Sequence, residues 1–437
     1  MSGVRTDLVW LCSQSVPDKN HCVFEEIGFV FYKSLMVLMA VVACSAAASQ
    51  DQLVKVDRPL QSHVDHKTRP QLATGVAMAP DGKLWIVGLN EKQRLFVQSS
   101  SLEKLGRWSA PVEIETYGDA ISADGENRPK IAFGPNGWVV ISYTKPLAKP
   151  YAGFIRMLRS GDGGKTFSAP FTVHQDRQEI THRFESIAFD AQGDLHTVWI
   201  DKRDQPPRDS GQKYVGAAIY RNISHDGGVT FEPDVKLADH SCECCRIALV
   251  QDPSGTLKAM WRHVFGEQTR DHAFSNVATS TPNQIVRASY DEWQINACPH
   301  HGPGLSFNDS DSAGGYHAVW FGIRQEGGQS VGGVRYARLA SNGEPVADTL
   351  KVIPDLRAEH ADVRSFANKV AIVWRSFEGN KTTLKAWLST DAGNTFEVKR
   401  MDEAAGYNDH PRLAQFGARM FIVWRQAEEV KTYEINF

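Results

Sequence analysis

One eight-residue pattern, S-x-D-x-G-x-T-F, occurs three times in this 437-residue chain and constrains its fold more than any other feature. The copies span residues 160–167, 224–231 and 389–396. In such a segment the Asp carboxylate can accept hydrogen bonds from its own turn, and Gly can adopt a positive φ. The Thr hydroxyl can bond back to the Asp, and the Phe ring can pack beneath the turn. The pattern therefore predicts three tight hairpins whose structural residues are Asp162, Gly164, Asp226, Gly228, Asp391 and Gly393.

A longer unit, two short apolar runs joined by a polar turn and often ending in Trp, recurs around these hairpins. It occupies residues 76–87, 131–142, 187–199, 247–261, 305–320, 363–374 and 413–424. Successive units begin about 50 to 60 residues apart, which is the period of a four-stranded propeller blade. We therefore expect an all-β propeller of four-stranded antiparallel blades, with seven blades favoured and six as the alternative.

The blade count also places the hairpins and the ends of the chain. The three hairpins fall between the third and fourth strands of blades 2, 3 and 6. Residues 430–436 supply only the third strand of blade 7. The segment 52–56 could add the fourth strand and close the ring, which would leave no open sheet edge.

The three hairpin sequences resemble the Asp-box, or bacterial neuraminidase repeat, of the sialidase-like β-propellers. The resemblance implies this architecture for most of residues 50–437, and it implies a hydrolase of the sialidase type as one activity. Sialidases hold the substrate carboxylate with three arginines, and they use a Tyr–Glu nucleophile and an Asp acid/base. Blade 1 lacks the expected Arg-Ile-Pro-type motif, and Arg128-Pro129 in blade 2 matches it only in part. The chain thus resembles the family in architecture far more than in its catalytic residues.

Residues 1–49 are expected to form an N-terminal extension and an export segment. Lys33 precedes the apolar run 35–44, and small residues follow at 45–49, which is the order of a secretory signal. Residues 41–44 also resemble a bacterial lipobox, which would place a lipid on Cys44; cleavage after one of the alanines 46–48 is the alternative. We expect an exported protein, in the periplasm, on the outer membrane or secreted.

The overall charge narrows the choice of partners. The net charge of −3 and the pI near 6.6 argue against a nucleic-acid partner. We expect a monomer that contacts a membrane only through a lipid on Cys44. The remaining ligand classes are a metal ion, a small molecule or an acidic glycan.

Cysteine and histidine residues recur at one position of successive blades, just before the innermost strand. In a propeller the loops that enter the innermost strands share one face, here called the axial face, with the loops that leave the second strands. The predicted ligands on this face are Cys242, Cys244, Cys245, Cys298, His300, His301, His360 and His410. Thiolates and imidazoles are ligands of Zn and Cu, so this pattern predicts a Cu or Zn site. The alternative is a disulfide such as Cys245–Cys298, with histidines that only line the channel.

Basic residues occupy the same face. Before the innermost strands these are Arg128, Arg183, Arg246 and Arg412, and after the second strands they are Lys145, Lys202, Arg203, Arg262, Arg324, Arg375 and Arg425. A cationic concave face suits an anionic ligand, whereas pairing with nearby Asp and Glu residues is the alternative. Glu185, with Asp201 or Asp204, could also supply a carboxylate pair for acid/base chemistry.

Three functions follow from these patterns. The first is an exported propeller that binds a metal ion through its Cys/His cluster. The second is a glycoside hydrolase or an acidic-glycan-binding propeller, with Arg128, Arg183, Glu185, Arg246 and Arg412 as candidate catalytic or binding residues. The third is an interaction scaffold for other envelope proteins.

Overall fold

The computed structural model describes residues 70–437 except 208, 213–215, 278–284, 296, 298 and 311–313. The predicted export segment, Cys44, the closing segment 52–56 and Cys298 lie outside the described residues. Apart from two 3₁₀ turns, Leu102–Lys104 and Pro135–Gly137, the regular structure of the described part is entirely β. None of the helical segments described is long and apolar enough to cross a membrane.

The strands form seven antiparallel sheets, which confirms the predicted seven-bladed propeller. The innermost strands are β1 (Gly75–Met78), β5 (Lys130–Phe133), β9 (His182–Phe189), β13 (Ala248–Gln251), β17 (Gly304–Phe307), β21 (Ala358–Phe366) and β25 (Arg412–Phe416). The second strands are β2 (Lys83–Leu89), β6 (Val139–Pro146), β10 (Leu195–Asp201), β14 (Leu257–Arg262), β18 (Tyr316–Glu326), β22 (Lys369–Glu378) and β26 (Arg419–Arg425).

The outer strands complete six of these sheets. The third strands are β3 (Leu95–Ser101), β7 (Gly153–Ser160), β11 (Ala217–Ser224), β15 (His272–Asn276), β19 (Gln329–Leu339), β23 (Lys381–Ser389) and β27 (Val430–Glu434). The fourth strands are β4 (Val112–Glu113), β8 (Phe171–Thr172), β12 (Val235–Ser241), β16 (Val286–Arg287), β20 (Lys351–Val352) and β24 (Glu397–Ala404). Within the described residues blade 7 therefore has three strands.

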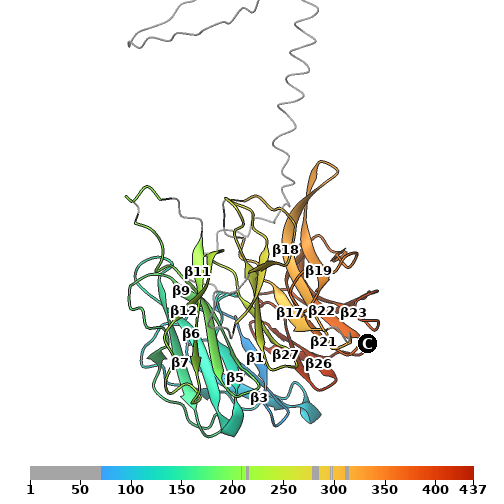
Figure 1. The fold of residues 1–437 in the computed structure, drawn as a ribbon. Helices are drawn as coiled ribbons and strands as arrows, with labels where there is room; N and C mark the ends of the chain where they lie inside the picture. The colour runs from blue at the N-terminus through green and yellow to red at the C-terminus, as the bar shows by residue number, and fades with distance from the viewer. Residues whose placement is uncertain are drawn as a thin grey trace, which may run out of the picture. The chain divides into compact units, whose positions relative to one another are not determined.

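The two ends of the described chain meet where blade 7 contacts blade 1. The blades follow one another in chain order, and the innermost strand of blade 1, β1, contacts the innermost strand of blade 7, β25; the blue and red ends of the described chain meet there (Figure 1). The backbone N–H of Thr74 donates to Oδ2 of Asp409 at 2.9 Å, and Nε1 of Trp108 donates to the carbonyl of Val430 at 3.0 Å. These bonds join residues more than 300 positions apart and hold blades 1 and 7 together.

The core lies between neighbouring blades, and the inner strands are buried on both faces, as in β10 and β11, where every residue is buried. Tryptophans late in the second strands dominate it, and Trp199, Trp261, Trp374 and Trp424 are at most 1% exposed. Each buried ring removes on the order of 200 Å² of apolar surface from water, a gain of about 5 kcal/mol before conformational entropy is counted. This packing explains why a Trp occurs in the second strand of each of blades 3 to 7.

The three predicted hairpins have the predicted geometry. In the third copy, Oδ1 of Asp391 accepts hydrogen bonds from Ser389 Oγ at 2.7 Å and from the N–H of Thr395 at 2.8 Å. Its Oδ2 accepts the Thr395 hydroxyl at 2.6 Å, and Gly393 has φ = +81°. The same bonds recur around Asp162 and Asp226. All three turns join third and fourth strands, so they lie at the end of the blades opposite the axial face.

Candidate functional site

Glu126 lies at the centre of the axial face and connects four blades. It belongs to the loop that leads into blade 2, and its side chain is 4% exposed. Oε1 accepts hydrogen bonds from Nη1 of Arg246 at 2.7 Å and from Nδ1 of His360 at 2.9 Å. Oε2 accepts the backbone N–H groups of Arg246 at 3.1 Å and Gly302 at 3.0 Å. Glu126 therefore joins its own loop to the loops of blades 4, 5 and 6.

The charge of Glu126 is fixed by these donors. Burial alone raises the pKa of this carboxyl, but the charge of Arg246 and the hydrogen bond from His360 hold its pKa well below the ordinary 4.5. An ionised carboxylate can only accept hydrogen bonds, so Nδ1 of His360 carries the proton in this pair.

Three of the predicted histidines form one stack beside Glu126. The rings of His360 and His410 lie 3.5 Å apart at 9° between planes, and those of His301 and His360 lie 4.3 Å apart at 20°. Phe321 continues the column, with its ring 4.5 Å from that of His301. We call His301, His360 and His410 the imidazole stack.

The imidazole stack is uncharged at neutral pH. Burial lowers the pKa of all three rings, and the pKa values of His301 and His410 lie well below 6.5 because burial and the repulsion that a protonated His360 would exert both disfavour their charged forms. For His360, the Glu126 carboxylate partly offsets the effect of burial on the pKa. Nδ1 of His301 and Nδ1 of His410 are buried and have no hydrogen-bond partner among the described residues.

Local backbone geometry directs these rings toward the axis. His360 has φ = +52°, and the register of β21 against β22 shifts between Glu359 and Asp362, as in a β-bulge. A positive φ is unfavourable for a residue with a Cβ and concentrates at functional sites. Behind the stack, a Cβ on Gly125 would lie 2.7 Å from Cε1 of His410, so the loop of Glu126 packs directly on that ring.

The three cysteines that precede blade 4 form a second cluster, here called the thiol triangle. The Sγ atoms of Cys242 and Cys244 are 3.8 Å apart, and each is 3.9 Å from Sγ of Cys245. An S–S bond is about 2.05 Å long, so no disulfide joins any two of these three residues. All three side chains are at most 5% exposed.

The thiol triangle lies between the axial loops of blades 3 and 4. The N–H of Cys242 donates to the carbonyl of Arg262 at 2.9 Å, which ties the start of the loop to β14. Burial, reinforced by a hydrogen bond with Cys242, raises the pKa of the Cys245 thiol well above 9.0. Without a bound cation this thiol is therefore protonated at neutral pH.

The second cysteine-containing segment adjoins the first. A Cβ on Gly302 would lie 2.7 Å from both N and O of Arg246, so the backbone that follows His301 packs against the residue that follows Cys245. Cys298 itself lies outside the described residues, and the predicted Cys245–Cys298 disulfide stays a prediction. His300 is exposed and has φ = +54°, and it does not belong to the imidazole stack.

The predicted ligands thus separate into two groups rather than one. Cys242, Cys244 and Cys245 form one possible metal-binding group, and Glu126, His360 and His410 form the other, in the part of the chain that the structure describes. His182, which occupies the same sequence position in blade 3, stacks instead on His174 with ring centres 3.9 Å apart.

Two of the predicted substrate-binding arginines are engaged in buried ion pairs. Arg128 donates to both carboxylate oxygens of Asp409, at 2.7 and 3.1 Å, and therefore links blade 2 to blade 7. Arg246 donates to Glu126 and also to the carbonyls of Pro303 and Ala361, at 3.0 and 2.6 Å. Sequence reasoning left two roles open for these guanidinium groups, a bound anion or pairing with nearby acids, and both groups form ion pairs that link blades.

The other candidate residues, Glu185, Arg183 and Arg412, differ in how closely they contact a polar partner. Glu185 is fully buried and accepts hydrogen bonds from Ser142 Oγ at 3.1 Å and Thr144 Oγ1 at 3.0 Å. Arg183 lies 3.6 Å from Asp124 and 3.4 Å from Ser122 Oγ. Arg412 lies 4.0 Å from its nearest carboxylate, that of Asp362.

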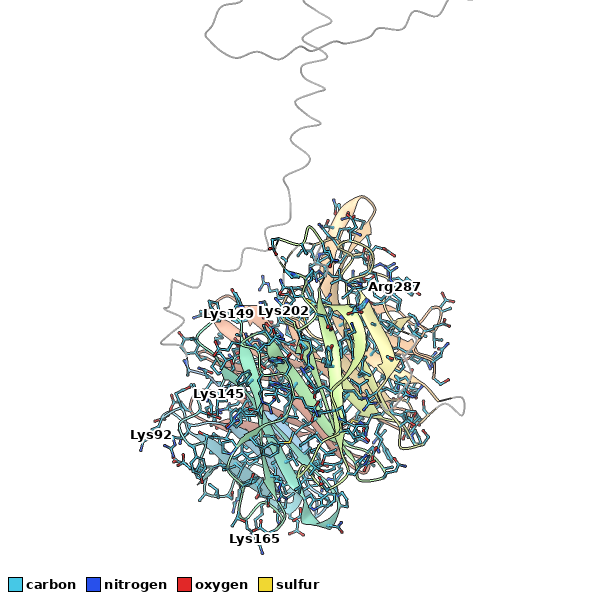
Figure 2. All side chains as sticks on the ribbon, turned by 60° about the vertical axis from the view of Figure 1, so that its left-hand side comes forward. Lys92, Lys145, Lys149, Lys165, Lys202 and Arg287 are labelled. Carbon is cyan, nitrogen blue, oxygen red and sulfur yellow. The ribbon has the colours of Figure 1, made fainter. Side chains whose placement is uncertain are left out.

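Most of the basic residues after the second strands contact nearby acidic side chains or backbone carbonyls, which is the alternative to binding an anionic ligand. Lys145 contacts Asp119 at 2.6 Å, and Arg203 contacts Asp201 at 2.7 Å. Arg375 lies 3.6 Å from Glu359, Lys202 pairs with Glu243, and Arg262 donates to the carbonyls of His301 and Phe321. Figure 2 places Lys149 and Lys202 toward the axial end of the sheets and Lys165, in the first hairpin, at the other end.

Sequence reasoning missed Glu126 and Phe321, whereas it included Asp362 among the acids that could pair with the arginines. Glu126 lies two residues before Arg128 in a polar loop, and nothing in its surrounding sequence distinguishes it from a solvated acid. Its hydrogen-bond partners come from residues more than 100 positions away, so no local pattern could have identified it.

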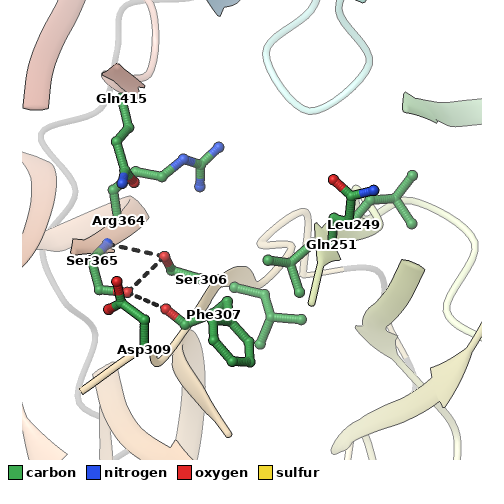
Figure 3. Close-up of a pocket in the computed structure, with 10 residues that line it drawn as sticks. Leu249, Gln251, Ser306, Phe307, Asp309, Arg364, Ser365 and Gln415 are labelled. Carbon is green, nitrogen blue, oxygen red and sulfur yellow. Dashed lines mark hydrogen bonds between the residues drawn. The ribbon is translucent and has the colours of Figure 1, made fainter. Parts of the chain in front are cut away.

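A separate pocket of about 360 Å³ opens at the end of the innermost strands opposite the axial face. Leu249, Gln251 and Phe307 line it together with Arg364 and Gln415, and Figure 3 shows Arg364 and Gln415 facing Leu249 and Gln251 across it. Its floor hydroxyls are already bonded, since Ser306 Oγ lies 2.9 Å from Ser365 Oγ and Ser365 Oγ donates to Phe307 O at 2.6 Å.

Comparisons with known proteins support the fold. No family model matches the chain, and neither does any curated protein. An ulvan lyase, bound to -[GlcA(1-4)Rha3S]-, is 15% identical over 83% of this chain and 93% of its own, with a TM-score of 0.52. The same lyase solved without that ligand gives 15% identity, a TM-score of 0.52 and coverage of 83% and 94%. A Hadza microbial sialidase is 12% identical over 78% of this chain and 73% of its own, with a TM-score of 0.44. At 15% identity and a TM-score of 0.52, the similarity to the ulvan lyase supports the fold alone.

Proposed function

We propose that this propeller binds a soft metal ion, Cu(I) or Zn(II), through Cys242, Cys244 and Cys245 on its axial face. The observation that carries the proposal is the thiol triangle, with its sides of 3.8–3.9 Å. Cys298 is the fourth ligand that the sequence predicts. The site belongs to an exported protein if residues 35–49 act as the signal that the sequence predicts.

The dimensions of the triangle fit a metal ion. Atoms at the corners of a triangle with sides of 3.8–3.9 Å lie about 2.2 Å from its centre, close to the Zn–S distance of about 2.3 Å. Three thiolates satisfy the preference of Cu(I), and a fourth ligand would complete the tetrahedron that Zn(II) adopts. Burial excludes water and competing hard cations, which prefer oxygen ligands.

The imidazole stack fits a metal ion less well. His360 and His410 are nearly parallel at 3.5 Å, so the lone pairs of their ring nitrogens point in parallel planes and do not converge on one point. Nδ1 of His360 also already donates to Glu126. The thiol triangle, and not the imidazole stack, is therefore the proposed metal site.

Elemental analysis of the purified protein, paired with a thiol count under denaturing conditions, tests the proposal. We expect one equivalent of Cu or Zn that is lost in Cys244→Ser and in Cys245→Ser. His225→Gln, which removes an exposed histidine from a hairpin, is the control and should retain the metal. If the purified protein contains no metal and takes up neither Cu(I) nor Zn(II), the metal site is excluded. A disulfide that includes Cys298 would support the alternative that these cysteines are structural.

A second candidate is the binding or hydrolysis of an acidic glycan at the axial face. The observation that favours it is the position of the exposed tyrosines: Tyr117, Tyr151, Tyr290 and Tyr407, all at least 40% exposed, lie in axial-face loops. Such rings can stack on sugars, and the ulvan lyase that shares the fold is bound to a uronate-containing glycan.

Two assays separate binding from hydrolysis. Affinity electrophoresis in gels containing ulvan should retard the wild type and retard Tyr117→Ala and Tyr151→Ala less. Release of sialic acid from 3′-sialyllactose would identify a hydrolase of the sialidase type. If the gel shows no retardation and no sialic acid is released, the interaction-scaffold function is favoured. No contact among the described residues points to that function in particular.

A further inference from the structure

Arg412 differs from three cations that surround it on the axial face, Arg128, Lys130 and Arg246. Arg128, Lys130 and Arg246 each lie within 3.4 Å of a carboxylate oxygen. The guanidinium group of Arg412, at the start of β25, donates no hydrogen bond to any of the described residues, and among these residues its nearest carboxylate oxygen, Oδ2 of Asp362, is 4.0 Å away. Its five N–H donors are therefore available to a ligand.

The carboxylate nearest to Arg412 is already engaged elsewhere. Oδ2 of Asp362 accepts the N–H of Leu413 at 3.0 Å, and Oδ1 accepts the N–H of Val363 at 3.1 Å. Oδ1 also lies 3.8 Å from Nη1 of Arg364. Asp362 thus neutralises two guanidinium groups only in part, and positive charge is left in excess at this point of the channel.

The surroundings of Arg412 make this excess charge costly. The side chain is only 12% exposed, and burying a cation without a close partner is unfavourable. Burial, followed by the charges of Arg128 and Arg246, lowers the pKa of Arg412 to about 9. The imidazole stack beside it is neutral, so it neither repels nor replaces an incoming anion.

We propose that Arg412 anchors an anion-binding site in the axial channel, which accepts the carboxylate or sulfate group of a small acid or of an acidic saccharide. A planar guanidinium binds such oxyanions through two parallel hydrogen bonds. An anion would supply the partner that Arg412 lacks and would offset the charges of Arg128 and Arg246. The site is distinct from the thiol triangle and does not depend on a metal ion.

Calorimetric titration with D-glucuronate, D-glucose 6-sulfate and D-glucose tests this inference and separates the two anion types. We expect heat of binding from at least one of the two charged sugars and none from glucose. Arg412→Gln should weaken that binding about tenfold or more, the effect expected when a hydrogen bond to a charged group is lost. Arg364→Gln removes the other guanidinium near Asp362, which lines the pocket at the end of the innermost strands opposite the axial face, and should leave binding unchanged.

Asp362→Asn is the decisive variant. The asparagine side chain can still accept the N–H of Leu413, but it no longer carries the negative charge that competes with the anion for Arg412. We expect it to bind the anion more tightly than the wild type, whereas a purely structural Arg412 would show no such gain. Thermal unfolding of each variant confirms that it is folded, and its metal content reports on the thiol triangle separately. Equal binding by Arg412→Gln and wild type, or no binding of either charged sugar by the wild type, would overturn the inference.

Discussion

The carboxylate of Glu126 accepts a hydrogen bond from Nδ1 of His360 at 2.9 Å, although the two residues are 234 positions apart in the chain. The same carboxylate holds Arg246 and Gly302, each next to a segment that the sequence identified by its cysteines and histidines. One buried acid therefore sets the relative positions of the thiol triangle and the imidazole stack. The predictions below begin with this residue.

Glu126→Gln should destabilise the protein by about 3–5 kcal/mol, because it leaves the buried Arg246 charge without its counter-ion. The amide NH₂ of glutamine would also face donors that need an acceptor. Denaturant unfolding measures the change. The matched control is Glu115→Gln, whose exposed pair with Arg94 should be worth less than about 1 kcal/mol. Equal stability of the two variants would contradict the role assigned to Glu126.

The imidazole stack should make the protein sensitive to mild acid. The pKa values of His301, His360 and His410 are lowered in the folded state, so the unfolded chain binds more protons as the pH falls below about 6.5. The free energy of unfolding is therefore highest above that pH and should decrease below it. Unfolding measured from pH 7.5 to 5 should show this decrease.

A variant isolates the contribution of one ring to this dependence. His301→Phe keeps an aromatic ring between Phe321 and His360 but removes one titrating group. In this variant the free energy of unfolding should fall less steeply between pH 6.5 and 5 than in the wild type. The difference in slope should correspond to at most one proton. An unchanged slope would show that the pKa of His301 is the same in the folded and unfolded states.

The glycine of the third hairpin should tolerate no side chain. Gly393 has φ = +81°, and an added Cβ would overlap Oη of Tyr336 on the neighbouring blade. Gly163, in the first hairpin, has a similar φ of +76° but nothing within 4 Å of an added Cβ. Gly163→Ala should therefore cost only the backbone strain, about 1 kcal/mol, and Gly393→Ala should cost several times more. Similar losses in thermal unfolding would show that the contact with Tyr336 is not limiting.

Metal affinity should increase with pH. Burial keeps the Cys245 thiol protonated, so a metal ion must displace protons when it binds the thiol triangle. The apparent affinity for Zn(II) should rise about tenfold per pH unit for each proton released between pH 6 and 8. Competition titration with a chromogenic chelator measures it, and a pH-independent affinity would indicate thiolates that are already ionised.

Local sequence patterns were sufficient for the fold. The bonds around Asp162, Asp226 and Asp391 join residues at most four positions apart, so their pattern is visible in the sequence itself. Blade number followed from the recurrence of strand pairs that often end in Trp, because each blade must bury its faces against its neighbours. The same repetition identified the positions of His301, His360 and His410 before their contacts were known.

The site was predicted only in part, for a physical reason. The sequence placed Cys242, Cys244 and Cys245 together, since three cysteines within four residues cannot lie far apart. It could not show that Arg128 and Arg246 are bound by Asp409 and Glu126. Nor could it show that Arg412 lacks such a partner among the described residues.

The sequence by itself determined the strands, the hairpins and the ring of blades, because these depend on hydrogen bonds and apolar spacing within short segments. Only the tertiary structure decided which charges in the channel are neutralised. Each of those pairs joins loops from different blades, and ring closure sets their distances. A shift of 1 Å between blades would be enough to change which guanidinium group remains open to a ligand.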